Sequence, residues 1–313
     1  MNCLYCYQPL EEGEVDFHAK CSKRIFGMPA PPEFPYDESQ MSQLALQVIQ
    51  SQIVVTGVQP KLSLTIAKGE NRWDTKRFTI VGLWGNYILK PPTLNYPEMP
   101  EVEDLTMHLA EIAKISVVPH TLIRLKSGQL AYMTKRVDRT DKGKIHMEDM
   151  CQLTERQTEH KYQASHEQVA KTLSKFSSNP GLDVVNFFEL VLFSFITGNA
   201  DMHLKNFSIL YDPIMGPVLS PAYDLLSTTL LNPKDDEDLA LNLNGKKKKI
   251  KREDFEAAFK TLKLDVKQQS NIFLKMEKAK NKWLECIQAS FLSPNFKNQY
   301  IQLIEERFDR LKA

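Results

Sequence analysis

An apolar run at residues 184–197 constrains this chain more than any other stretch. It is apolar almost throughout, which predicts a helix that is buried on every side. It is too short to span a bilayer, and it ends at Gly198, whose freedom at positive φ suits a helix stop. The polar residues that follow are therefore expected on a loop that leaves a rigid buried helix, where catalytic groups can be held in fixed positions.

That loop carries Asp201 and Asn206, five residues apart, and Asp224 follows eighteen residues after Asn206. The catalytic loop of protein kinases has the same spacing: its Asp receives the proton of the attacking hydroxyl, its Asn binds Mg²⁺, and a later Asp completes the metal site. Phosphoryl transfer needs oxygen ligands for cations because the transferred group carries negative charge. An Asp and an Asn at this distance also occur as ordinary capping or turn residues, so the pair alone does not decide.

A lysine earlier in the chain fits the same chemistry. Lys90 ends the predicted strand at residues 87–90 and is followed by two prolines, as expected for a strand lysine that holds ATP phosphates. Kinases steady this lysine with a helix glutamate, for which Glu103 is the candidate and Glu101 the rival. Either glutamate is otherwise explained as a first-turn residue favoured by the helix dipole.

Six short motifs occur together in order over roughly residues 50–260. They are TGVQPKL (56–62), YILKP (87–91), TKRVDR (134–139), EDMCQ (148–152), the Asp201 loop and YDLLS (223–227). With these motifs the chain resembles the HipA-like serine/threonine kinases, toxins of bacterial toxin–antitoxin systems, and in particular the short form found in split HipBST-type systems. The resemblance implies an α+β, bilobal protein-kinase-like fold, with a small antiparallel β-rich N-lobe and a larger, mostly helical C-lobe.

The resemblance also implies roles for individual residues. Asp201 would be the catalytic base, Asn206 and Asp224 the Mg²⁺ ligands, and Lys90 with Glu103 the pair that holds the ATP phosphates. Other residues expected around the nucleotide are Gly57, Val58, Gln59 and Lys61 in the phosphate loop, Lys135 and Val137 near the adenine in the segment that joins the lobes, and His203 and Lys205 beside the γ-phosphate.

The phosphate loop departs from the protein-kinase pattern, because it contains one glycine, Gly57, and Pro60 has no N–H to donate. In the resembled family, serines of this loop are autophosphorylated, which ejects the loop from the nucleotide site. Of the two corresponding positions here, Val54 and Thr56, only Thr56 has a hydroxyl. Thr56 is therefore the expected autophosphorylation site, unless the switch is absent from this chain.

The first residues hold Cys3-x2-Cys6 and His18-x2-Cys21, four soft ligands at a spacing close to that of small zinc knuckles. In a reducing compartment such crowding favours a metal over disulfides. Four protein ligands would make a structural zinc site. The alternative is a chance cluster in a terminal segment.

Composition and patterning predict the organisation of the chain. Residues 1–28 are expected as the Cys/His segment, 29–40 as a proline-rich linker, 41–137 as the N-lobe and 138–313 as the helical C-lobe. The absence of a signal peptide and of long apolar runs favours a cytoplasmic protein with no membrane span. The net charge of +1 gives no case for strong direct nucleic-acid binding.

We therefore expect an ATP- and Mg²⁺-dependent serine/threonine protein kinase that inhibits translation, with an aminoacyl-tRNA synthetase as the default substrate. Longer relatives carry an additional N-terminal subdomain before their kinase lobe, whereas here that lobe is expected to begin near residue 40. The resemblance thus implies two partners, a small HipS-like protein and a helix-turn-helix HipB-like antitoxin. The alternatives are a small-molecule phosphotransferase and a nucleotide-binding pseudokinase that acts as an interaction module.

Overall fold

A computed structural model describes residues 1–37, 39–41, 61–67, 76–81, 85–140 and 142–312. The chain divides into two compact units. Unit 1 comprises residues 1–104, 118–136 and 289–291, and unit 2 comprises residues 105–117, 137–288 and 292–313. The apolar pattern of residues 41–51 predicts a helix, and all of these residues except Met41 lie outside the described ranges.

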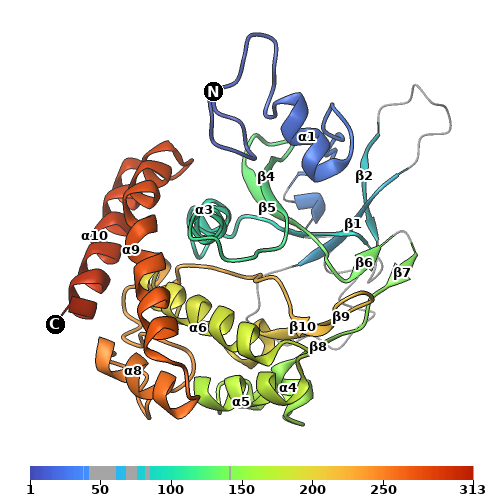
Figure 1. The fold of residues 1–313 in the computed structure, drawn as a ribbon. Coiled ribbons are helices and arrows are strands. Elements are labelled where there is room, and N and C mark those ends of the chain that lie inside the picture. The colour runs from blue at the N-terminus through green and yellow to red at the C-terminus, as the bar shows by residue number, and fades with distance from the viewer. Residues whose placement is uncertain (38, 42–60, 68–75, 82–84, 141, 313) are drawn as a thin grey trace. The chain divides into compact units, whose positions relative to one another are not determined.

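Unit 1 is built on a five-stranded antiparallel sheet with strand order β2-β1-β3-β5-β4 (Figure 1). Its elements are α1 (Ala19–Phe26), β1 (Leu62–Ile66), β2 (Phe78–Val81), β3 (Tyr87–Lys90), β4 (His120–Arg124) and β5 (Leu130–Lys135). Alternating apolar residues predict strands at residues 62–66 and 87–90, and two segments joined by a Ser127-Gly128 turn predict a hairpin over residues 117–136. The structure confirms them as β1, β3 and the β4–β5 hairpin. Helix α3 (Met99–Ile112) contributes residues 99–104 to unit 1 and the rest to unit 2.

The core of unit 1 includes residues from the N-terminal segment. Phe26 of α1 packs edge-on against Phe78 of β2, and Phe34 lies against the same ring. Residue Glu33 exchanges backbone hydrogen bonds with the start of β2, which fixes the proline-rich stretch along that strand. The stretch expected as a linker therefore contributes a buried aromatic ring to the core.

Unit 2 is mostly helical, with a three-stranded sheet of order β10-β9-β8 and the two-stranded β6–β7 (Figure 1). Its strands are β6 (Arg139–Thr140), β7 (Gly143–Lys144), β8 (Met147–Asp149), β9 (Ser208–Asp212) and β10 (Gly216–Leu219). Its helices are α4 (Met150–Leu153), η1 (Thr158–His160), α5 (His166–Phe176), α6 (Pro180–Ile196), η2 (Leu204–Asn206), α7 (Thr228–Leu231), α8 (Arg252–Thr261), α9 (Val266–Ala289) and α10 (Pro294–Lys312).

Helix α6 is the predicted central helix and begins slightly earlier than expected, with Pro180 at its first position. Phe187, Phe188, Phe193 and Phe195 of α6 are fully buried. The rings of the last three meet aromatic residues of α8 and α9, namely Phe259, Trp283 and Phe255. A helix packed on all sides in this way is a fixed point from which the following loop emerges. Among the described residues, no helix combines the length and apolarity needed to cross a membrane.

Candidate active site

The loop after α6 is held at both ends. Gly198 adopts a φ of +67°, and a Cβ there would lie 2.7 Å from a methyl of Leu303, so only glycine fits without movement. The loop backbone bonds to the start of α7: the Gly198 carbonyl accepts from the Thr229 N–H at 3.0 Å, and the Ala200 N–H donates to the Thr228 hydroxyl at 2.9 Å. The predicted helix stop is confirmed, and the loop is anchored within unit 2.

Asp201 and Asn206 are joined by a short network. The Asn206 Nδ2 donates to the backbone carbonyl of Asp201 at 3.0 Å, and the Asp201 N–H donates to the Asn199 side chain at 3.2 Å. Because the amide nitrogen of Asn206 is engaged in this way, its amide oxygen points to the other side and can serve as a cation ligand. Asn206 is buried, whereas Asp201 is partly exposed and accessible to a substrate hydroxyl.

Asp224 is brought to the same loop through its neighbour. The Tyr223 hydroxyl donates to the Lys205 carbonyl at 3.0 Å and shares a 2.6 Å hydrogen bond with the Ser208 hydroxyl. Asp224 itself has a φ of +60°, an unusual conformation for a residue with a Cβ. Asp224 and Asn206 offer a carboxylate and an amide oxygen, which are the kinds of ligand that a hard cation such as Mg²⁺ takes.

The other two residues predicted in this loop are His203, which is buried, and Lys205, which forms an ion pair. His203 is buried, and burial lowers the pKa of its imidazole although Asp201 and Asp224 act in the opposite direction. The neutral form is therefore favoured at physiological pH, and such a ring supplies no charge for a phosphate. Lys205 donates to Asp149 at 2.9 Å, and Asp149 in turn caps α4.

Tyr162 is a site residue that the sequence analysis missed. Its hydroxyl donates to Asp201 Oδ1 at 2.6 Å, and its ring meets His203 edge-on at 5.1 Å. Burial and the hydrogen bond to Asp201 both raise the pKa of the phenol, so it stays protonated and remains a donor at neutral pH. No local sequence motif predicts this contact, because Tyr162 and Asp201 are 39 positions apart in the chain.

Lys90 and Glu103 form a buried ion pair in unit 1, with side chains that are 6% and 0% exposed. Lys90 comes from the end of β3, and Glu103 from the first turns of α3. The Tyr132 ring on β5 lies 5.4 Å from the Lys90 ammonium. The rival Glu101 has a pKa raised to about 7, chiefly by burial. The structure thus pairs Lys90 with Glu103, as the sequence analysis expected.

The remaining predicted residues are distributed as follows. Lys61 is exposed immediately before β1, and Lys135 is exposed at the end of β5. Val137 is partly buried at the start of the unit 2 segment that follows β5. Thr56, Gly57, Val58 and Gln59 lie outside the described residues.

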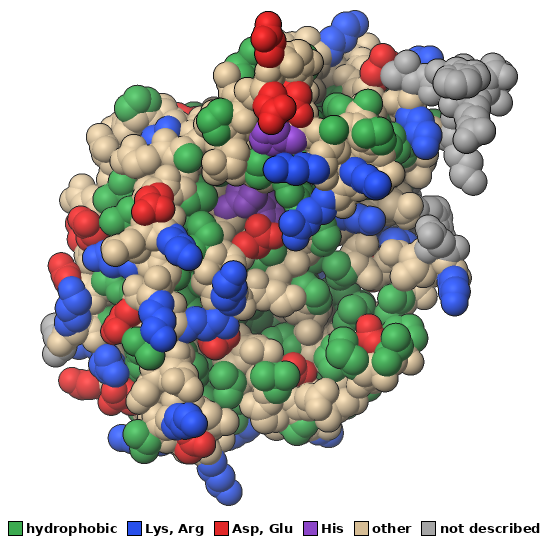
Figure 2. Space-filling model, turned by 45° about the horizontal axis from the view of Figure 1, so that its top comes forward, with side chains coloured by type: hydrophobic (Ala, Val, Ile, Leu, Met, Phe, Trp, Pro, Cys, Tyr) green, Lys and Arg blue, Asp and Glu red, His purple; other side chains and the backbone are tan. Residues whose placement is uncertain are grey.

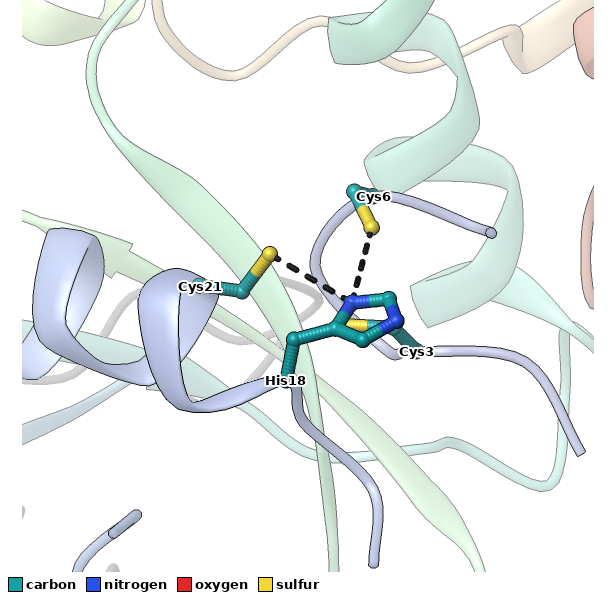
Figure 3. Close-up of side chains that lie close together, drawn as sticks. All are labelled: Cys3, Cys6, His18 and Cys21. Carbon is teal, nitrogen blue, oxygen red and sulfur yellow. Dashed lines mark hydrogen bonds between the residues drawn. The ribbon is translucent and has the colours of Figure 1, made fainter. Parts of the chain in front are cut away.

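Four soft ligands gather in unit 1, as the sequence predicted they could. Cys3, Cys6, His18 and Cys21 point toward one another, and their ligand atoms all lie within 4.8 Å of one another (Figure 3). The cysteines come from the first turn of the chain and from α1, whose N-cap is His18. This cluster is in the same unit as the Lys90–Glu103 pair.

Comparison with known proteins identifies relatives of the chain. A protein of Sinorhizobium fredii named "Putative kinase Y4dM" is 32% identical over 234 residues, covering 71% of this chain and 55% of its own length. A second protein of that organism, "Putative kinase Y4mE", is 34% identical over 192 residues, covering 58% of this chain and 44% of its own length. The chain therefore spans about half the length of these relatives.

Solved structures share the fold. HipA of Shewanella oneidensis, in a complex with HipB and operator DNA, superposes with a TM-score of 0.69 at 22% identity, covering 90% of this chain and 74% of that one. The Helicobacter pylori proinflammatory kinase CtkA gives a TM-score of 0.54 at 14% identity, covering 80% and 93%. These matches confirm the predicted kinase-like fold of antiparallel sheet and helices.

A family model named HipA-like C-terminal domain matches residues 53–283, well over half of the chain. This match includes the Lys90, Asp201, Asn206 and Asp224 positions. The chain belongs to the HipA-like C-terminal domain family.

Proposed function

We propose that this chain is a protein kinase that transfers the γ-phosphoryl group of ATP to a serine or threonine hydroxyl. The observation that carries the proposal is the arrangement of Asp201, Asn206 and Asp224, which the hydrogen bonds of Asn206 and Tyr223 hold on one anchored loop system. Unit 1, with the Lys90–Glu103 pair, would serve as the N-lobe, and unit 2 as the C-lobe.

In this proposal Asp201 orients the acceptor hydroxyl and accepts its proton as the hydroxyl oxygen bonds to the γ-phosphorus. The bond between the γ-phosphorus and the bridging oxygen breaks, and ADP leaves with the electron pair. Asn206 and Asp224 would hold Mg²⁺, which neutralises phosphate charge when bound. Lys90, kept in place by Glu103, would bind the α- and β-phosphates.

Tyr162 would position the catalytic carboxylate. Its hydroxyl already donates to Asp201 Oδ1, which leaves Oδ2 as the oxygen available to a substrate hydroxyl. A charge-assisted hydrogen bond of this kind fixes the rotamer of the carboxylate at a modest cost in basicity. We assign Tyr162 a positioning role, because its contact is with Asp201.

We further propose a regulatory modification and partners. Thr56 would be the autophosphorylation site, since a phosphate there adds about two negative charges to the phosphate loop and would compete with ATP. A HipB-like DNA-binding antitoxin is supported by the HipA–HipB–DNA assembly of the Shewanella relative. Figure 2 shows acidic and basic side chains interspersed over the face in view, in keeping with the net charge of +1. DNA contact would then fall to the partner, because DNA affinity depends on phosphate neutralisation.

The substrate proposal is an aminoacyl-tRNA synthetase, whose phosphorylation would inhibit translation, and a small HipS-like protein is the second proposed partner. Both rest on the family resemblance. Mass spectrometry of phosphopeptides after reaction with a host lysate identifies the substrate directly. Co-purification from the native host tests for both partners.

The deciding experiment incubates the purified chain with labelled ATP, Mg²⁺ and a lysate, in parallel with Asp201→Asn. We expect labelled protein with the parent and none with Asp201→Asn. Asp309→Asn is the matched control, because Asp309 is exposed on α10 and its ion pair there is with Lys312, three residues away. Labelled small molecules would replace the proposal by a small-molecule phosphotransferase. Nucleotide binding without any label would replace it by a pseudokinase.

A further inference from the structure

The four-residue cluster at the N-terminus has the dimensions of a metal site. His18 Nδ1 lies 3.4 Å from Cys6 Sγ and 3.7 Å from Cys21 Sγ (Figure 3). A tetrahedral zinc ion with Zn–S near 2.3 Å and Zn–N near 2.05 Å would place sulfur and nitrogen ligands about 3.6 Å apart. All three cysteines are free thiols in the structure, so the close approach does not come from a disulfide.

The orientation of His18 is that of a metal ligand. Its Nε2 lies 2.9 Å from the Pro9 carbonyl, which can only accept a hydrogen bond, so Nε2 carries the proton. In the neutral ring, Nδ1 then presents its lone pair to Cys6 and Cys21. Metal-binding histidines are commonly oriented by a backbone carbonyl in this manner.

The backbone that follows Cys3 makes a tight turn. The Tyr7 N–H donates to the Cys3 carbonyl at 2.9 Å and closes a tight turn, with Tyr7 at a φ of +60°.

The same turn reaches helix α3. The Tyr7 hydroxyl donates to Asp104 Oδ2 at 2.7 Å in a buried contact, and His120 Nδ1 bonds the other oxygen of Asp104 at 2.7 Å. The Leu4 carbonyl accepts from the Thr121 hydroxyl on β4 at 3.2 Å. The turn that carries two of the cysteines is thus bonded both to the sheet and to α3.

Asp104 adjoins Glu103, which pairs with Lys90. Adjacent helix residues point about 100° apart, so one turn of α3 is held from two sides, by Tyr7 and His120 at Asp104 and by Lys90 at Glu103. A shift of the Tyr7 turn would therefore move Asp104, the neighbour of Glu103 in the proposed ATP-binding pair.

We propose that Cys3, Cys6, His18 and Cys21 bind one structural zinc ion, and that this zinc fixes the Tyr7 turn against α3 and so steadies the Lys90–Glu103 pair. The evidence for the zinc site is the geometry of the four ligands. The expected effect of zinc on ATP binding rests on the proposed function. With four protein ligands the ion has no open position, so its role is structural.

The first experiment measures zinc in the full-length protein by elemental analysis and compares Cys3→Ser/Cys6→Ser with Cys286→Ser, a cysteine of α9 outside the cluster. We expect about one zinc per chain in the parent and in Cys286→Ser, and a loss to near zero in the double variant. Cobalt substitution of the parent should give the visible absorption of a tetrahedral cobalt–thiolate site, which avoids reliance on a variant that misfolds. A metal-free parent, or a parent with a Cys–Cys disulfide in this segment, would overturn the zinc site.

The second experiment tests the link to α3 with Tyr7→Phe, which removes the hydroxyl and keeps the ring. We expect full zinc content, faster amide exchange at residues 99–104, and an ATP dissociation constant raised about threefold to tenfold through the loss of one buried hydrogen bond. Unchanged exchange in α3 would overturn the link while leaving the zinc site. If neither parent nor variant binds ATP, the proposed function fails, and zinc content and exchange still decide this inference.

Discussion

Replacing Tyr162 with Phe isolates the hydroxyl that contacts the proposed catalytic carboxylate. The change removes a 2.6 Å hydrogen bond to Asp201 and leaves the ring in place against His203. Hydrogen bonds to charged groups contribute about 1.5–3 kcal/mol. Because residue Tyr162 is 39% exposed, the lower end of this range applies. At about 1.4 kcal/mol per tenfold, this amounts to a fall of about tenfold in kcat/KM.

The assay is steady-state phosphorylation, with the protein substrate varied at saturating ATP in one series and ATP varied in a second series. KM for ATP should stay near the parent value, because the lost hydroxyl touches Asp201 rather than the residues proposed to bind phosphates. Tyr211→Phe is the matched control: the Tyr211 hydroxyl donates to Glu148 at the same 2.6 Å, elsewhere in unit 2. That variant should keep parent activity.

Two results would refute the reasoning. Activity of Tyr162→Phe equal to that of Tyr211→Phe would mean that the hydrogen bond does not orient Asp201. Activity above the parent level would mean that the Tyr162 hydroxyl occupies the place of the substrate hydroxyl and inhibits the enzyme. Thermal unfolding of both variants shows whether any change in rate reflects loss of folded protein.

Three further predictions concern other parts of the chain. Burial raises the pKa of Glu101 from 4.5 to about 7, so the parent protein loses stability as pH rises from about 4.5 to 7. In urea unfolding, Glu101→Gln should therefore be more stable than the parent by up to about 3 kcal/mol at pH 8 and nearly equal to it at pH 4. Asp238→Ala leaves Arg307 and Arg310 without their buried partner and should cost about 3–5 kcal/mol in the same assay, whereas a loss below 1 kcal/mol would contradict this. Thr56→Ala should abolish autophosphorylation in phosphopeptide mapping, and a phosphate found elsewhere would remove Thr56 from the proposal.

The sequence predicted those features that depend on local pattern. Helix α6 and strands β1 and β3 follow from apolar patterning, and the β4–β5 hairpin follows from the Ser127-Gly128 turn between two strand-like segments. The kinase-like fold was expected from the family resemblance that the motifs carry. The Lys90–Glu103 contact could be expected because a known chemistry requires a partner for the lysine.

Contacts between distant residues could not be predicted in the same way. The hydrogen bond between Tyr162 and Asp201 depends on how the segment before α5 folds back over the loop, and no single motif contains both residues. Similarly, Lys205 of the Asp201 loop pairs with Asp149 of the EDMCQ motif, and nothing in either motif indicates this contact. The prolines around Phe34 are typical of a linker, so the sequence did not predict that its ring is buried against Phe78 of β2.

Backbone conformation and proposed function favour different residues at position 224, where φ is +60°. A residue with a Cβ in this region costs about 1–2 kcal/mol relative to an ordinary conformation, and glycine avoids that cost. The proposed metal site, however, needs a carboxylate there. A sequence redesigned for stability alone would therefore place glycine at position 224, and would remove the proposed ligand from a protein that still folds well. Screens that rank variants of this chain by melting temperature should accordingly hold this position fixed.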